Sequence, residues 1–170
     1  MKKPDNNSLV IFGASGDLTH RKLIPALFHL FKNGRLADDF AILGVSRTEF
    51  TDEQYREKLS DILSRSENIE KSEMDEFFTH VYYQAIDTAN VEDYAKVKVR
   101  LEEFEQTHHT HGNTLFYLST PPSLYPVIPA CLAAHGLNHQ NNGWKRLVVE
   151  KPFGYDLASA ISLDSKLHQD

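Results

Sequence analysis

The sequence predicts an α/β fold, a doubly wound, mostly parallel sheet with helices on both faces. Five short apolar segments alternate with helical segments along the 170 residues, and no internal repeat or Pro/Gly/Ser-rich linker interrupts them. Strands that alternate with helices in this way pair in parallel through crossover connections. The first strand also runs directly into a glycine turn, which is typical of a Rossmann sheet. We therefore expect residues 1–170 to form one such domain.

The first predicted strand covers residues 9–12, four apolar residues in succession that suit a strand covered on both faces. Gly13 and Gly16 then permit a sharp turn, and a helix is expected from about 18 to 32. The spacing Gly-x-x-Gly-x-x-Thr puts Thr19 at the third position of the usual glycine fingerprint. Because the first N–H groups of the helix face the turn, the unit is predicted to bind a phosphate. A tight turn without a ligand is the alternative.

The next elements follow from periodicity and capping. A second strand is predicted over Phe40–Ser46, and Thr51 with Gln54 is typical of a capping box that starts a helix to about residue 64. Residues 73–80 are expected to add one or two helical turns before a third strand at 81–86. Apolar side chains then recur about every 3.6 residues over 91–106, which predicts an amphipathic crossover helix.

The fourth strand is predicted over residues 114–119. The proline pair 121–122 ends it, because proline cannot donate to a strand ladder. Ser123 is expected to cap the next helix, which carries Pro126 in its first turn and ends at Gly136.

The fifth strand is predicted over Lys145–Val149, and a last helix is expected to start near Asp156 or Leu157. Lys151 follows the fifth strand at the edge where ligands of such sheets bind. It is a candidate for the place where nicotinamide and substrate meet, and Pro152 allows a cis bond after it. A plain strand terminator is the alternative.

Several polar residues surround the glycine turn. The Ser15 hydroxyl is a candidate phosphate ligand, whereas Asp17 fits either a ligand or a helix cap. His20, Arg21 and Lys22 put positive charge on the first helical turn, where it opposes the helix dipole. This conflict favours a role for Lys22 near a phosphate or a substrate oxygen, and a solvated surface lysine is the alternative.

Arg47 is the most discriminating candidate. NAD-specific domains usually end the second strand with an acid that accepts from the ribose 2′-hydroxyl, but here the strand ends in Ser46 and Arg47. A guanidinium there can hold a 2′-phosphate, so the sequence predicts NADP as cofactor. A solvated surface arginine is the alternative.

Composition narrows the possible partners. The formal net charge of −6 gives no reason to expect nucleic acid or an acidic membrane surface, and the N-terminal apolar run is too short for a signal peptide or a membrane span. The single cysteine, Cys131, cannot form an internal disulfide, which favours a cytoplasmic setting. His108, His109 and His111 lie in a polar loop without a thiol or paired acid, so no metal site is expected.

Four motifs in order resemble the amino-terminal NADP-binding domain of the glucose-6-phosphate dehydrogenase family. They span nearly the whole chain and are Gly13-Ala-Ser-Gly-Asp-Leu-Thr-His-Arg-Lys-Leu-Ile-Pro25, Gly44-Val-Ser-Arg47, Phe116-Tyr-Leu-Ser-Thr-Pro-Pro-Ser-Leu-Tyr125 and Val149-Glu-Lys-Pro-Phe-Gly154. Where the family commonly has alanine, this chain has Thr19, which should only tighten the turn.

The resemblance implies a set of site residues. The positions that match the family's cofactor contacts are Gly13, Ala14, Ser15, Gly16, Asp17, Leu18, Thr19, His20, Arg47, Asp87, Thr88, Tyr125 and Lys151. Lys22 and Lys151 match positions on the substrate side.

The resemblance also implies a reaction: hydride transfer from C1 of β-D-glucose 6-phosphate to NADP, giving 6-phosphogluconolactone and NADPH, the first step of the pentose phosphate pathway. In the family, the substrate-phosphate motif begins just after the final helix, and the base histidine comes from the following carboxy-terminal β+α domain, through which homo-oligomers usually form. Both the motif and that domain are absent from these 170 residues. No catalytic residue is therefore expected within this chain, and the isolated chain is expected to lack turnover.

Two other functions fit parts of the sequence. A short-chain dehydrogenase or epimerase would use the Tyr-x-x-x-Lys pattern formed by Tyr94 and Lys98, although this pair precedes the fourth strand and Tyr94 fits an apolar helix stripe. A non-catalytic NADP sensor module would suit a short chain.

Overall fold

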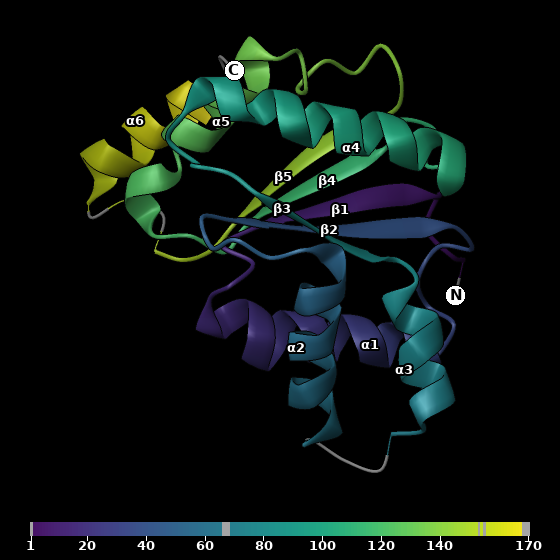
Figure 1. The fold of residues 1–170 in the computed structure, drawn as a ribbon. Coiled ribbons are helices and arrows are strands. Elements are labelled where there is room, and N and C mark those ends of the chain that lie inside the picture. Colours follow the sequence, from purple (N-terminus) through teal and green to yellow (C-terminus); the bar gives the residue numbers. More distant parts are fainter. Residues whose placement is uncertain (1, 66–68, 153, 155, 168–170) are drawn as a thin grey trace.

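The computed structural model describes residues 2–65, 69–152, 154 and 156–167, and its core is a five-stranded parallel sheet. The strand order is β3-β2-β1-β4-β5, so the direction of winding reverses at β1 (Figure 1). The strands are β1 (Asn7–Phe12), β2 (Phe40–Ser46), β3 (Val81–Ala85), β4 (Thr114–Leu118) and β5 (Lys145–Val149). In register, Phe12 lies beside Val45 on one side and Leu118 on the other. The predicted doubly wound fold is confirmed.

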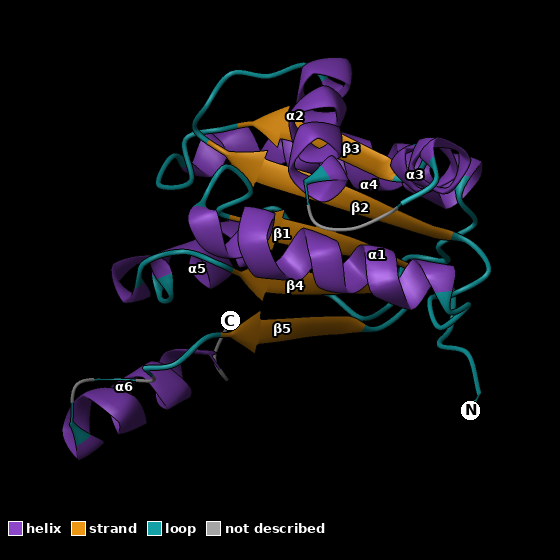
Figure 2. Ribbon diagram, turned by 90° about the horizontal axis from the view of Figure 1, so that it is seen from below, coloured by secondary structure: helices purple, strands orange, loops and turns teal. Residues whose placement is uncertain are grey.

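Helices cover both faces of the sheet, as Figure 1 shows. One face carries α1 (Ile24–Lys32), α2 (Asp52–Ser64) and α3 (Lys71–Phe78), and the other carries α4 (Tyr94–Thr107) and α5 (Val127–Ala134). Alternate residues of β1 separate the two cores, with Val10 and Phe12 in one and Ile11 in the other. In Figure 2, α6 (Leu157–Leu167) lies beyond the end of β5 rather than against the sheet.

Local signals account for several element boundaries. The capping box is present, because Gln54 N donates to Thr51 Oγ1 at 3.2 Å and Thr51 N donates to Gln54 Oε1 at 2.9 Å. Gly136 ends α5 with φ of +69°, a conformation that glycine adopts without steric cost. The Lys151–Pro152 bond is cis.

Other boundaries differ from the prediction. The helix after the glycine turn begins at Asp17 but contains a π-helical segment, Thr19–Leu23, before α1. α3 begins two residues earlier than expected, β3 and β4 each end one residue earlier, and a 3₁₀ turn (Val91–Asp93) precedes α4.

The prediction that Ser123 caps a helix is wrong. The segment Pro122–Leu124 is a 3₁₀ turn without a side-chain cap, and α5 begins only after Pro126. Two consecutive prolines fix φ and remove two N–H donors, so the chain closes a tight turn in which Leu124 N donates to Pro121 O at 3.0 Å.

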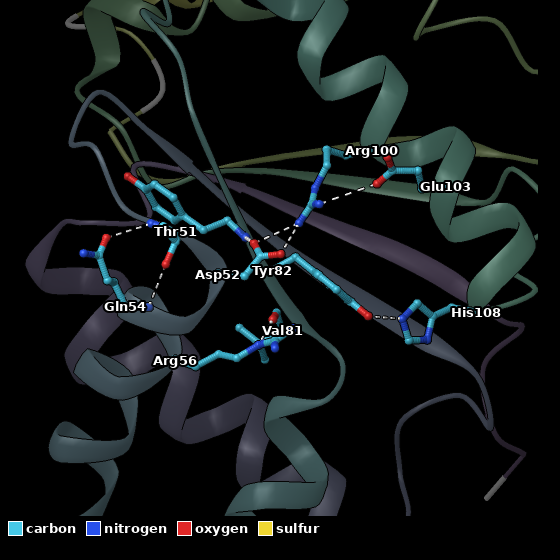
Figure 3. Close-up of polar contacts among 10 residues, drawn as sticks. Thr51, Asp52, Gln54, Arg56, Val81, Tyr82, Arg100, Glu103 and His108 are labelled. Carbon is cyan, nitrogen blue, oxygen red and sulfur yellow. Dashed lines mark hydrogen bonds and ion pairs between the residues drawn. The ribbon is translucent and has the colours of Figure 1, made fainter.

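Side chains close the outer edge of β3 (Figure 3). Arg56 Nε donates to Val81 O at 2.6 Å, and Tyr83 N donates to Asp52 Oδ1 at 2.6 Å. Arg100 from the opposite face reaches both carboxylate oxygens of Asp52, at 2.8 and 2.7 Å. These contacts satisfy edge groups that would otherwise invite another strand to pair. Within the described ranges, no helix is both long and apolar enough to span a membrane.

Candidate functional site

A cleft of about 520 Å³ opens at the carboxyl ends of the central strands, next to the reversal at β1. Ligands of doubly wound sheets bind at this position. The cleft combines the glycine turn with the ends of β2, β3 and β4. Its lining residues are Gly13, Ser15, Gly16, Ser46, Arg47, Thr48, Thr88, Ser119, Thr120, Pro121 and Leu124.

The glycine turn needs glycine at its first position. Gly13 has φ of +86°, and a Cβ there would overlap the backbone carbonyl of Ser119. The N–H groups of Gly13 and Ala14 both donate to Val45 O, at 2.9 and 3.1 Å. A Cβ on Gly16 would lie 3.0 Å from Gly13 O. The turn is thus held tightly against β2 and β4, and its surface is bare backbone that a phosphate can approach.

Thr19 and Ala14 hold the turn from within. The buried Thr19 hydroxyl donates to Gly13 O at 3.1 Å and lies 3.3 Å from Ser119 Oγ. Ala14 is fully buried, and its carbonyl accepts from Tyr55 at 3.1 Å. Neither side chain lines the cleft, so both act on the shape of the turn.

A cluster of four hydroxyl groups lies beside the turn. Ser46 Oγ is 2.9 Å from Ser15 Oγ and 2.6 Å from the Tyr83 hydroxyl, which donates to Thr48 O at 2.7 Å. Thr48 Oγ1 is 3.3 Å from Ser15 Oγ. The side chain of Arg47, between Ser46 and Thr48, is exposed at the wall of the cleft.

The two predicted residues that follow β3 differ in whether they line the cleft. Thr88 is buried and lines the cleft, whereas Asp87 is exposed and does not. The Asp87 carboxylate accepts from Ala89 N at 3.0 Å, and the backbone N–H of Asp87 donates to Asp93 Oδ2 at 2.8 Å. Asp87 therefore stabilises the loop that follows β3.

Predicted residues on the helix after the turn are also absent from the residues that line the cleft. Asp17, Leu18 and Lys22 are exposed, and Asp17 lies 3.4 Å from Arg21. His20 is partly buried, and burial, followed by the charge of Lys58, lowers the pKa of its imidazole.

Tyr125 and Lys151 lie beyond β4 and β5. Tyr125 is 1% exposed, and its hydroxyl donates to Glu150 O at 3.0 Å, so it holds the residue that follows β5 and does not line the cleft. Lys151 is exposed.

Tyr117 donates to the Glu150 carboxylate, and burial together with that carboxylate raises the pKa of Tyr117 to about 12. A second hollow, of about 290 Å³, lies next to Pro152 and Gly154.

The Tyr-x-x-x-Lys hypothesis is wrong. Tyr94 is fully buried and donates to Thr88 O at 2.8 Å, while burial raises the pKa of its hydroxyl far above neutrality. Lys98 lines a different hollow, at the amino ends of β4 and β5, whereas the cleft lies at the carboxyl ends of the strands. A proton relay needs both groups at one reacting centre.

Sequence reasoning missed Thr48, Tyr83, Ser119 and Thr120. The Ser-Thr pair carried a usable signal, because it directly follows the fourth apolar run. Tyr83 carried no such signal, since it lies inside a strand and its neighbours depend on strand order.

Among the described residues, no group of three or more His, Cys, Asp or Glu side chains is arranged to hold a metal ion.

Comparisons with known proteins agree on one family. The family described as "Glucose-6-phosphate dehydrogenase, NAD binding domain" matches residues 10–170. A glucose-6-phosphate 1-dehydrogenase from Aggregatibacter actinomycetemcomitans is 56% identical over 167 residues, which cover 98% of this chain and 34% of that protein. The enzyme of that name from Treponema pallidum is 41% identical over 162 residues, covering 94% and 32%.

Solved structures give the same result. A structure titled as glucose-6-phosphate dehydrogenase in complex with its substrate glucose-6-phosphate superposes with a TM-score of 0.84 at 35% identity, covering 99% of this chain and 35% of that one. A glucose-6-phosphate 1-dehydrogenase from Mycobacterium avium gives 0.82 at 28% identity, covering 98% and 34%. The chain thus spans about a third of the length of these relatives.

Proposed function

The chain belongs to the glucose-6-phosphate dehydrogenase family, and from that premise we propose that it binds NADP as the cofactor half of an enzyme that oxidises glucose 6-phosphate. The parent enzyme transfers a hydride from C1 of the sugar to the nicotinamide and releases 6-phosphogluconolactone and NADPH. The single buried cysteine is consistent with our proposal of a cytoplasmic enzyme.

The glycine turn fits a dinucleotide pyrophosphate. Its surface lacks Cβ atoms at Gly13 and Gly16, and the helix that begins at Asp17 directs the positive end of its dipole at the turn. Ser15 adds a hydroxyl at the same place. A bound cofactor supplies the hydride acceptor, while these residues position and neutralise its phosphates.

The position of Arg47 is the observation on which the proposed preference for NADP rests. It stands at the carboxyl end of β2, on the wall of the cleft, where an NAD-specific domain would place an acid. Its guanidinium can form charge-assisted hydrogen bonds with a 2′-phosphate. Its neighbours in sequence, Ser46 and Thr48, have hydroxyl groups within 2.9 and 3.3 Å of Ser15 Oγ and also line the cleft.

The sugar site is proposed to lie beyond β5. Lys151 and Lys22 are the candidates for the substrate side, although both are exposed and neither lines the cleft. No histidine or carboxylate side chain is among the cleft's described lining residues. Removal of the C1 hydroxyl proton needs a base, so we propose that a part of the enzyme outside this chain supplies it.

Calorimetric titration of the 170-residue chain with NADP and with NAD tests the cofactor proposal. Replacing Arg47 by alanine removes charged hydrogen bonds worth about 1.5–3 kcal/mol, which corresponds to about 10- to 150-fold weaker NADP binding. NAD binding should change less than about twofold, since NAD lacks the 2′-phosphate.

Arg146→Ala is the matched control, because Arg146 is an exposed arginine on β5 whose guanidinium stacks on Trp144 at 4.5 Å. Equal losses for the two cofactors in Arg47→Ala would refute the NADP assignment, and wild-type protein that binds neither cofactor would refute the proposed function. Rapid NADPH formation from glucose 6-phosphate by this chain alone would refute the assignment of the base to another part of the enzyme.

A further inference from the structure

The hydroxyl of Tyr83 joins the two residues on either side of Arg47. It donates to the backbone carbonyl of Thr48 at 2.7 Å and lies 2.6 Å from Ser46 Oγ. Both contacts come from β3, the neighbouring strand, and neither involves the Arg47 side chain. The backbone of residues 46–48 is therefore fixed by a group outside its own strand.

Tyr83 is itself held firmly. Its side chain is 4% exposed, and its ring packs against Phe50 and Tyr55 with centroid distances of 5.4 and 4.6 Å. Its N–H donates to Asp52 Oδ1 at 2.6 Å. Gly44, its register partner on β2, leaves the space that the Tyr55 ring occupies, since a Cβ there would lie 2.9 Å from that ring. The hydroxyl thus has a fixed position from which to hold other groups.

We propose that Tyr83 is a positioning residue that sets the preference for NADP over NAD, by holding residues 46–48 so that the Arg47 guanidinium is presented to the 2′-phosphate. This inference rests on the proposed function of the cleft. It assigns to a buried residue of β3 a part of the selectivity for NADP that comes from Arg47, the exposed arginine that follows β2.

The physical basis is preorganisation. Burial raises the pKa of Tyr83, so its hydroxyl stays protonated and remains a donor to Thr48 O at neutral pH. Without the hydroxyl, the Thr48 carbonyl loses this donor and Ser46 Oγ keeps only Ser15 of its two hydroxyl neighbours. The segment then samples other conformations, and affinity falls with the fraction of molecules in the competent one.

The effect should be selective for the phosphorylated cofactor. The backbone of the glycine turn, which is proposed to hold the pyrophosphate, is fixed by Val45, Ser119 and Thr19. Tyr83 reaches this turn only through Ser46, whose hydroxyl lies 2.9 Å from Ser15 Oγ. Loss of one neutral hydrogen bond that orders a segment predicts about five- to tenfold weaker NADP binding for Tyr83→Phe. NAD binding should weaken by less than about twofold, because NAD lacks the 2′-phosphate that Arg47 is proposed to bind.

Tyr55→Phe is the matched control. Tyr55 is an equally buried tyrosine whose ring contacts Tyr83, but its hydroxyl donates to Ala14 O in the glycine turn. Its loss should weaken NADP and NAD to the same extent. Melting temperatures of both variants, measured beside the titrations, separate a general loss of structure from a change in selectivity.

A double variant tests whether Tyr83 acts through Arg47. In an Arg47→Ala background, adding Tyr83→Phe should leave NADP affinity unchanged within about twofold, since the group that Tyr83 positions is gone. A full further five- to tenfold loss, or equal losses of NADP and NAD in Tyr83→Phe alone, would overturn the inference. If Arg47→Ala is selective for NADP and Tyr83→Phe is not, the inference fails while the proposed function stands.

Discussion

Asp52 connects both faces of the sheet at the edge of β3, and replacing it by alanine should destabilise the fold markedly. Its carboxylate accepts from Arg100 Nη2 at 2.8 and 2.7 Å and from Tyr83 N at 2.6 Å (Figure 3). Arg100 comes from α4 on one face, and Asp52 begins α2 on the other. The variant removes all three contacts and leaves Arg100 with one carboxylate contact, to Glu103 Oε2 at 3.5 Å.

The magnitude follows from the burial of the pair. The side chains of Arg100 and Asp52 are 21% and 22% exposed, so the pair lies between a surface ion pair, worth about 0–1 kcal/mol, and a buried one, whose disruption costs about 3–5 kcal/mol. The unpaired Tyr83 N–H adds part of a hydrogen bond. We expect the free energy of unfolding to fall by about 2–4 kcal/mol, and the melting temperature by about 4–16 °C for a chain of this length.

Urea unfolding followed by circular dichroism measures the change, and Glu53→Ala provides the matched control. Glu53 is an exposed acid in the same first turn of α2, so its loss removes a similar interaction with the helix dipole but no contact to β3. Because the pair between Asp52 and Arg100 is partly shielded from solvent, most of its contribution to stability should persist at high salt. Asp52→Ala and Glu53→Ala variants that agree within about 0.5 kcal/mol would refute this account of the edge.

Two further perturbations address the glycine turn and the histidines beside the start of β3. Gly13→Ala should abolish cofactor binding and cost about 2 kcal/mol or more, because φ is +86° and the new Cβ would overlap the Ser119 carbonyl; calorimetry and urea titration measure both, and retained affinity would refute it. Burial and the charge of His80 lower the pKa of His108 below its usual 6.5, so the unfolded chain protonates first. Stability is then complete above pH 6.5 and falls as the pH drops through the folded value; His108→Gln should lose less stability between pH 7.5 and 5.5 than wild type, and parallel losses would refute it.

The elements that could be predicted from the sequence have local causes. Thr51 with Gln54 fixes the start of α2 through contacts within one turn, and an uninterrupted apolar run marks β1. Ser123 failed as a cap because the prolines before it impose a 3₁₀ turn, which overrides a preference that is also local. Element order and boundaries therefore followed from neighbours in sequence wherever no proline competed.

The site was predictable only where one strand end defines it. Gly13 and Arg47 follow directly from the ends of β1 and β2, and the structure places both on the cleft. Asp87 follows β3 and Tyr125 lies just beyond the prolines that follow β4, but the Asp87 carboxylate accepts from Ala89 N and the Tyr125 hydroxyl donates to Glu150 O. The Tyr125 contact depends on which elements pack together, and no spacing along the chain encodes it.

Tyr83 shows how an edge strand can shape a site it does not line. Its N–H is fixed by Asp52, which Arg100 holds from the opposite face, and its hydroxyl fixes the residues around Arg47. The outward-facing N–H closes the sheet edge, while the side chain packs between helix and sheet and reaches the end of β2. The backbone N–H of Tyr83 thus contributes to stability, and its hydroxyl contributes to the proposed cofactor selectivity. Loss of the Asp52 carboxylate should act mainly on folding, whereas loss of the Tyr83 hydroxyl should act mainly on the choice of cofactor.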